Sequence, residues 1–196
     1  MDMRKPLFPA LALAAAVSTG FSSTLSASDV DYTYGELRYI FDGEIDDFDL
    51  DGFRFGGSFR LTQDIYLFGS YDDAEADDVN VDITVLKFGA GYIYPINPTW
   101  DANFALAIAR AEFDGTGTGD DESGVEITGG VRGKFKPEIE VRAELNYTTV
   151  EMVDDSYAYL SLGGDYYFTP NVSAGLELDL GGDYETLTLG ARYHFK

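Results

Sequence analysis

Beyond residue 30, apolar and polar side chains alternate at every second position in one segment of the chain after another. The alternation is cleanest in five segments, at residues 52–61, 125–135, 139–148, 172–180 and 186–195. Five less regular segments lie near residues 31–41, 65–72, 80–94, 100–113 and 157–168. Because successive side chains of a β-strand point to opposite faces, a period of two predicts strands with one apolar and one polar face. The sequence therefore predicts an all-β chain of ten strands, with eight as the alternative count.

The segment 80–94 changes face partway along its length. Val81, Ile83 and Val85 occupy one phase of the alternation, whereas Leu86 and Phe88 occupy the other. A β-bulge would produce such a change, and so would a strand that runs past the edge of a membrane.

The connections between these segments fall into two classes that alternate along the chain. Short connections, often with a proline, lie at residues 62–64, 95–99, 136–138 and 169–171. Acidic and mostly longer connections lie at residues 42–49, 73–78, 114–124, 153–156 and 181–183. An up-and-down antiparallel barrel places the two classes at opposite ends, and short periplasmic turns with longer external loops are typical of outer-membrane barrels.

The position of the aromatic residues indicates which face of the barrel meets lipid. On the apolar face they gather toward the short turns, at Phe59, Tyr92, Trp100, Phe104, Phe135, Tyr166, Phe168, Tyr193 and Phe195. Aromatic side chains form such girdles at membrane interfaces, whereas a soluble lipocalin-like barrel would bury its largest rings inside. We therefore predict a closed transmembrane barrel with its polar face inward, because open sheet edges are not tolerated in lipid.

The N-terminus predicts export from the cytoplasm. Arg4 and Lys5 precede an apolar stretch at residues 7–17, and a small, polar stretch follows at residues 22–28. This is the pattern of a cleaved signal peptide, and its apolar stretch is shorter than the roughly 20 residues that a transmembrane helix needs. We assign residues 1–28 to the signal peptide and residues 29–196 to the barrel domain. The chain has no cysteine, which excludes a lipoprotein anchor and a disulfide scaffold.

The last strand carries a family resemblance. Residues 187–195, which end on Tyr193, His194 and Phe195, resemble the C-terminal signal by which outer-membrane barrels are recognised for insertion. That signal normally ends on the aromatic residue, whereas here Lys196 follows it. The mature chain resembles the small barrels of the OmpA-like and OmpX-like superfamily, which are eight-stranded. The resemblance implies a Gram-negative outer membrane, both termini in the periplasm, and the barrel-assembly machinery as a partner of the last strand.

Two sequence features are candidates for chemistry. His194 is the only histidine, and histidine with aspartate or serine is the machinery of barrel-type proteases and lipid-modifying enzymes. Its place at the periplasmic end of the last strand favours a structural role. Asp47, Asp49 and Asp51 match the start of a calcium loop, although the twelfth position is Ser58 instead of glutamate. We predict a weak divalent cation site there, for Ca²⁺ or Mg²⁺, and no other cofactor.

The polar face predicts a lumen in which charges of both signs are interleaved. By phase, fifteen charged residues point inward: Glu36, Arg38, Arg54, Arg60, Lys87, Asp101, Arg132, Lys134, Glu140, Arg142, Glu144, Asp165, Glu177, Asp179 and Arg192. Charges in a confined interior persist when they are paired, so we expect side chains to fill the lumen.

These features lead to three functional hypotheses. The first is a monomeric structural or surface-interaction protein without catalytic activity, whose acidic loops meet cations, lipopolysaccharide or other surfaces. The alternatives are a narrow pore for small ions or solutes and a surface enzyme that acts on lipid or peptide. The net charge of −22 excludes a nucleic-acid partner, which would need a basic patch.

Overall fold

The computed structural model of the chain describes residues 29–45, 48–76, 81–114, 120–150, 155–182 and 184–195. The predicted signal peptide, residues 1–28, lies outside them. No helix long and apolar enough to cross a membrane is found among the described residues.

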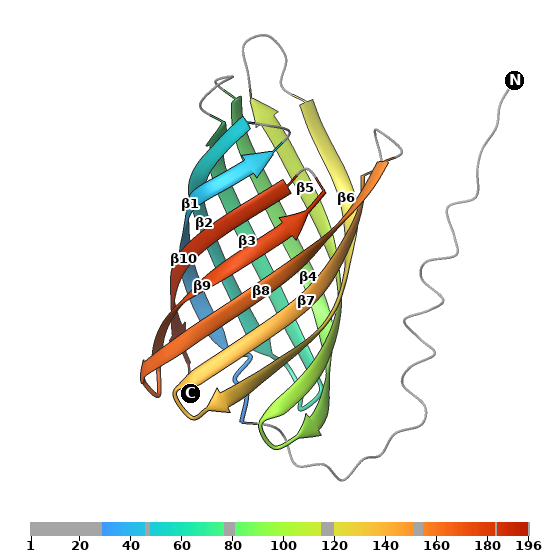
Figure 1. Ribbon diagram of the computed structural model, residues 1–196. Helices are drawn as coiled ribbons and strands as arrows, with labels where there is room; N and C mark the ends of the chain where they lie inside the picture. Colours follow the sequence, from blue (N-terminus) through green and yellow to red (C-terminus); the bar gives the residue numbers. More distant parts are fainter. Residues whose placement is uncertain are drawn as a thin grey trace, which may run out of the picture.

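Ten strands form one closed antiparallel barrel in the described part of the chain (Figure 1). This confirms the predicted fold class and the count of ten. The strands are β1 Tyr34–Ile45, β2 Phe48–Arg60, β3 Ile65–Ala76, β4 Val81–Asn97, β5 Trp100–Asp114, β6 Asp120–Lys136, β7 Ile139–Val150, β8 Asp155–Thr169, β9 Val172–Gly181 and β10 Tyr184–His194.

Each strand pairs with its neighbour in the chain, and β1 pairs with β10 to close the barrel. The closing register runs from Tyr34 opposite His194 to Ile45 opposite Tyr184, with an irregularity between Ile40 and Asp42. All strand edges are therefore satisfied, as a barrel in lipid requires.

Strands extend into several of the segments that the sequence assigned to acidic connections. The connection between β1 and β2 falls at residues 46 and 47, so most of the segment 42–49 belongs to paired strands. Asp73 and Glu75 likewise lie within β3, paired with β4. Charge density marked these segments as loops, but the strands continue beyond the apolar wall, where the extended ladder satisfies the backbone and the carboxylates meet water.

The change of face in segment 80–94 comes from such an extension and not from a bulge. The register of β4 against β3 is continuous from Val81 to Tyr92. Val81, Ile83 and Val85 therefore share the inward phase of Lys87. Ile83 packs against a small apolar cluster at the end of the lumen opposite the chain termini, formed by Ile40, Leu50, Ala74 and Ala76.

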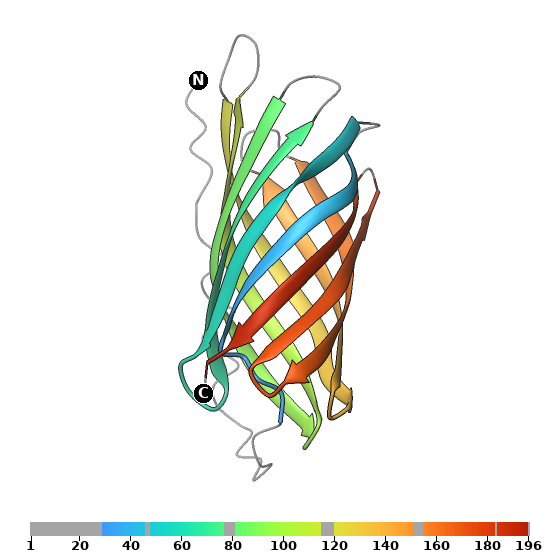
Figure 2. The ribbon, with the colours of Figure 1, turned by 90° about the vertical axis from the view of Figure 1, so that its left-hand side faces the viewer.

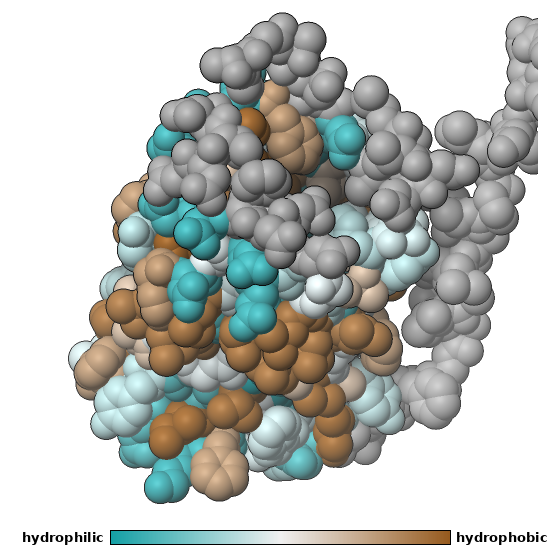
Figure 3. Space-filling view, turned by 45° about the horizontal axis from the view of Figure 1, so that its top comes forward, coloured by the Kyte–Doolittle hydropathy of each residue, from teal (hydrophilic) through white to brown (hydrophobic). Residues whose placement is uncertain are grey.

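The outside of the barrel is apolar and the inside is polar. Side chains on the outer face include Phe55, Phe88, Ile108 and Leu145, all exposed. Figure 3 shows brown side chains grouped across the outer face, with hydrophilic side chains above and below them. Seven of the nine predicted girdle aromatics are exposed, and the other two, Tyr92 and Trp100, are half-buried. Because exposed apolar area of this extent is not stable in water, the wall is the lipid-facing surface of a membrane barrel.

Candidate functional site

The lumen is the candidate site, and Arg142 on β7 lies at its centre. The Arg142 guanidinium donates from Nη1 to Asp165 Oδ2 at 2.6 Å and from Nε to Glu177 Oε2 at 3.0 Å. Its Nη2 also donates to Glu177. Asp165 lies on β8 and Glu177 on β9, so one arginine joins three consecutive strands inside the barrel. Charge-assisted bonds of this kind are about twice as strong as neutral ones.

Two further arginines extend this network toward the seam of the barrel. Arg192 Nε on β10 donates to Glu36 Oε2 at 2.7 Å, and Arg192 Nη1 donates to Asp165 Oδ2 at 3.2 Å. Arg38 Nε on β1 donates to the same oxygen of Glu36 at 3.0 Å. The network therefore ties the first strand to the last from the inside.

Away from the chain termini, the lumen holds two further cations. Arg54 Nε donates to Asp72 Oδ1 at 2.6 Å, and its Nη1 donates to Glu177 Oε1 at 3.0 Å. Lys87 Nζ donates to Glu126 Oε2 at 2.8 Å. The Lys87 and Arg54 side chains are 17% and 16% exposed, compared with 13% for Glu36.

The middle of the lumen is closed to solvent, where the side chains of Arg38 and Asp165 are each 1% exposed. Toward the chain termini, Arg132 Nε donates to Glu140 Oε1 at 2.7 Å, and the Tyr167 hydroxyl donates to Glu140 Oε2 at 2.8 Å. We call the part of the lumen around Arg54 and Lys87, which keeps some solvent exposure, the vestibule.

Glycines in the wall make room for the large charged side chains. A Cβ added to Gly163 would lie 2.5 Å from Cζ of Arg142, and one added to Gly130 would lie 2.6 Å from Cγ of Glu144. The charged residues and glycines that alternate in the sequence are therefore two parts of one packing arrangement.

All fifteen charged residues predicted to point inward are buried or half-buried in the barrel. Their partners differ from those that the sequence suggested. Arg142 lies between Glu140 and Glu144 on its own strand, yet it binds carboxylates of β8 and β9. Glu140 instead accepts from Arg132, and Glu144 accepts from Asn103 at 2.6 Å.

Sequence reasoning missed three members of the network. Asp72 lies in a segment whose alternation is irregular, so its phase gave no signal. Glu126 lies on the polar phase of a clean segment, and that phase could have placed it inside. Tyr159, whose hydroxyl donates to Glu126 Oε2 at 2.7 Å, has the inward phase of β8 but looks like any apolar strand residue.

His194 lies between Ser173 and Asp31, an order that resembles a Ser-His-Asp triad. Its Nε2 is 3.3 Å from Ser173 Oγ, and its Nδ1 is 3.6 Å from Asp31 Oδ2. However, the His194 and Ser173 side chains are fully buried, and the Tyr167 ring covers the imidazole at a centroid distance of 4.9 Å. A nucleophile without access for a substrate cannot act as one, so the arrangement is better suited to holding Asp31 in place.

The predicted cation site lies only partly within the described residues. Asp47 is outside them, while Asp49 and Asp51 are exposed at the external end of β2. Within the described ranges, no group of three acidic, histidine or cysteine side chains is arranged to hold a metal ion. The weak cation site remains a prediction.

Comparison with solved structures shows which class of fold this is. The NanC porin matches with a TM-score of 0.50 and 8% identity, over 82% of this chain and all of that one. An outer-membrane channel from Pseudomonas putida F1 matches with a TM-score of 0.50 and 13% identity, over 90% of this chain and all of that one. No protein-family model and no curated protein sequence matches the chain.

The chain therefore has the closed antiparallel fold of outer-membrane porins and channels. With its apolar outer wall, it is an integral outer-membrane β-barrel. The comparisons support this broad class and do not single out the eight-stranded OmpA-like and OmpX-like superfamily.

Proposed function

We propose that the protein is a narrow outer-membrane pore for small ions or solutes, with a preference for cations. The observation that carries the proposal is a lumen lined by charged side chains, in which Arg54 and Lys87 lie among carboxylates and keep 16% and 17% of their side-chain surface exposed. A charged lining of this kind suits the passage of ions and polar solutes. A porin and a channel are among the similar solved structures, which supports transport over surface interaction.

The interior polar atoms support a wet lumen. Arg38 Nη1 and Thr188 Oγ1 are buried and make no hydrogen bond to the described part of the protein. Buried polar atoms of this kind are usually satisfied by ordered water, because leaving them bare costs about 1–3 kcal/mol each. Water molecules at these positions would continue the aqueous path from the vestibule into the ion-pair network.

The charges around the vestibule favour cations. Arg54 and Lys87 are accompanied by Asp72, Glu126 and Asp179 in the external half of the lumen. The strand ends above them are mainly acidic. Because carboxylates outnumber cations there and a cleft with a net charge concentrates counter-ions, we expect cations to enter more readily than anions. A ten-stranded barrel filled with arginines limits the path to small solutes.

A second candidate function is the structural or surface-interaction barrel. The dense ion pairs of the periplasmic half favour it, since a sealed lumen passes nothing. We further propose that the chain is a monomer with both termini in the periplasm, that its last strand engages the barrel-assembly machinery, and that its external end meets lipopolysaccharide.

Planar-bilayer recording separates the two functions. We expect small, reproducible single-channel steps from refolded protein and a reversal potential that shows cation preference in a salt gradient. Heat-denatured protein from the same preparation is the matched control for contaminating porins. Silent bilayers at high protein concentration would reject the pore and leave the structural barrel.

A further inference from the structure

The residues that precede β1 enter the periplasmic mouth of the lumen. Residues 29–33 form the short blue segment at the bottom of the barrel, beside the C-terminus, in both Figure 1 and Figure 2. Val30 is 1% exposed and Tyr32 is 2% exposed, which is less than most residues of the strands themselves. They belong to an apolar cluster with Tyr66 of β3, Ile93 of β4 and Ala105 of β5.

Cationic and aromatic side chains of the wall contact the Tyr32 ring. The ring centroid lies 4.9 Å from that of Tyr66. The guanidinium carbons of Arg132 and Arg60 lie 4.8 Å and 5.1 Å from the Tyr32 centroid. Cation–π contacts are strongest where they are shielded from water, so this ring anchors the segment.

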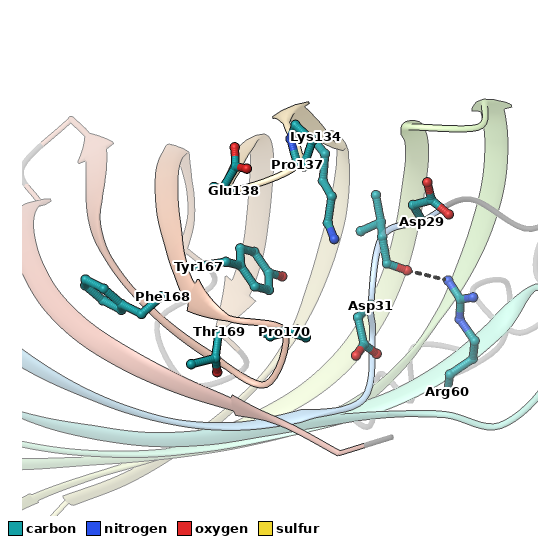
Figure 4. A pocket seen from close by; sticks show the side chains of 11 residues that line it. Asp29, Asp31, Arg60, Lys134, Pro137, Glu138, Tyr167, Phe168, Thr169 and Pro170 are labelled. Atoms are coloured by element: carbon teal, nitrogen blue, oxygen red, sulfur yellow. Dashed lines mark hydrogen bonds between the residues drawn. The ribbon is translucent and has the colours of Figure 1, made fainter.

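The same arginines also bind the backbone of the segment. Arg60 Nη2 donates to the Val30 carbonyl at 3.1 Å, and Arg132 Nη2 donates to the Asp31 carbonyl at 3.0 Å. The first of these bonds is the dashed line in Figure 4. At the far end, the Asp29 amide donates to the Pro98 carbonyl at 2.8 Å in the turn between β4 and β5. The segment thus contacts walls on several sides of the mouth.

Asp31 provides a further contact, toward the last strand. Its carboxylate accepts from the Thr33 amide at 2.8 Å and lies beside His194. Burial alone would raise the pKa of Asp31, but the neighbouring His194, the hydrogen bond from the Thr33 amide and the charge of Arg132 outweigh it and hold the pKa below its ordinary value. Asp31 is therefore charged at neutral pH.

The segment is held mainly by side chains rather than by a strand ladder. The β1–β2 and β1–β10 ladders both begin at Tyr34, after the segment has ended. A pocket of about 570 Å³ lies next to it, with Asp29, Asp31 and Arg60 on one side and Tyr167 and Phe168 on the other (Figure 4). Space for movement is therefore present at the mouth. Withdrawal would break the bond from the Phe195 amide to the Thr33 carbonyl, at 3.0 Å, but none of the residue pairs of the β1–β2 and β1–β10 ladders.

We propose that residues 29–33 are a plug that closes the periplasmic mouth of the lumen, and that its withdrawal opens the path between the vestibule and the periplasm. The role in conduction rests on the pore function proposed above, whereas the closure itself does not.

Thiol labelling tests the closure independently of conduction. The chain has no cysteine, so Ser58→Cys introduces a unique thiol on β2, one inward position above Arg60. Ser58 Oγ is buried and has no hydrogen-bond partner in the described protein, so the change removes no bond. We expect a charged, membrane-impermeant maleimide to label this thiol slowly, and at least tenfold faster when Val30→Ala and Tyr32→Ala are added.

Three variants control this measurement. Gln63→Cys lies exposed in the β2–β3 turn and should label at one rate with or without the plug changes. Tyr32→Phe retains the ring, and the Tyr32 hydroxyl has no hydrogen-bond partner among the described residues, so slow labelling should persist. Heat-modifiable gel mobility shows whether the variant with both alanine changes folds. If it does not fold, the single change Val30→Gly replaces it.

The outcomes separate the plug from the pore. Faster labelling with larger single-channel steps supports both, and faster labelling with silent bilayers supports the plug while rejecting the pore. Equal labelling of Ser58→Cys with and without the plug changes would overturn the proposal, whether or not the wild-type protein conducts.

Discussion

Removing Arg142 should destabilise the barrel more than any change at its surface. Arg142→Ala removes the nearest cation from Asp165 and Glu177, in a part of the lumen where the arginine side chain is 5% exposed. Asp165 keeps Arg192 at 3.2 Å, and Glu177 keeps Arg54 at 3.0 Å. Removing one partner of a buried ion pair costs about 3–5 kcal/mol, and these remaining pairs offset part of that cost. We therefore expect the free energy of unfolding in lipid vesicles to fall by about 3 kcal/mol, the lower end of that range.

The matched control is the surface pair of Arg110 and Glu112. These side chains are 55% and 53% exposed and lie 3.2 Å apart. Exposed pairs contribute about 0–1 kcal/mol, so Arg110→Ala should be nearly neutral. Urea unfolding followed by the fluorescence of Trp100, the only tryptophan, measures both variants with one probe.

A double-mutant cycle identifies the cause. If the loss comes from uncompensated carboxylates, Arg142→Ala combined with Glu177→Gln should cost less than the sum of the two single changes. Additive losses would show that Arg142 acts only through its volume. A loss for Arg142→Ala no larger than that for Arg110→Ala would refute the buried network.

Three further predictions follow from the wall, the last strand and the plug. Gly163→Ala forces a methyl group against the central arginine and should cost about 1–3 kcal/mol, whereas Gly182→Ala, which meets open space, should leave the urea midpoint unchanged. Phe195→Ala should lower the yield of heat-modifiable barrel more than deletion of Lys196 does, and equal losses would contradict the role of the aromatic as insertion signal. Because the folded pKa of Asp31 lies below its unfolded value, its contribution is present above about pH 4 and is lost as the pH falls through the folded value. The gap in unfolding free energy between wild type and Asp31→Asn should therefore shrink between pH 7 and pH 3, and a constant gap would argue against this contact.

The sequence determined the architecture because strand alternation is a local property. A side chain on the polar phase of a strand faces the lumen whichever strands lie beside it, so Arg38, Asp165 and Glu177 could be placed inside from phase alone. The position of the aromatics then decided which face met lipid. Strand ends were less certain, because the acidic ladders beyond the membrane, as at Asp73, have the composition of loops.

Only the tertiary structure decided which of these residues meet. Arg142 neighbours Glu140 and Glu144 in its own strand, yet it binds Asp165 and Glu177, because curvature of the wall and the direction of the side chain set the distances across the lumen. The sequence pattern did not predict the plug, for the same reason. Tyr32 has the phase of an ordinary strand residue, and nothing in the local pattern indicates that residues 29–33 leave the wall to enter the mouth. That placement depends on Arg60 and Arg132, which are distant in sequence and are brought to one point only when β1 and β10 close the barrel.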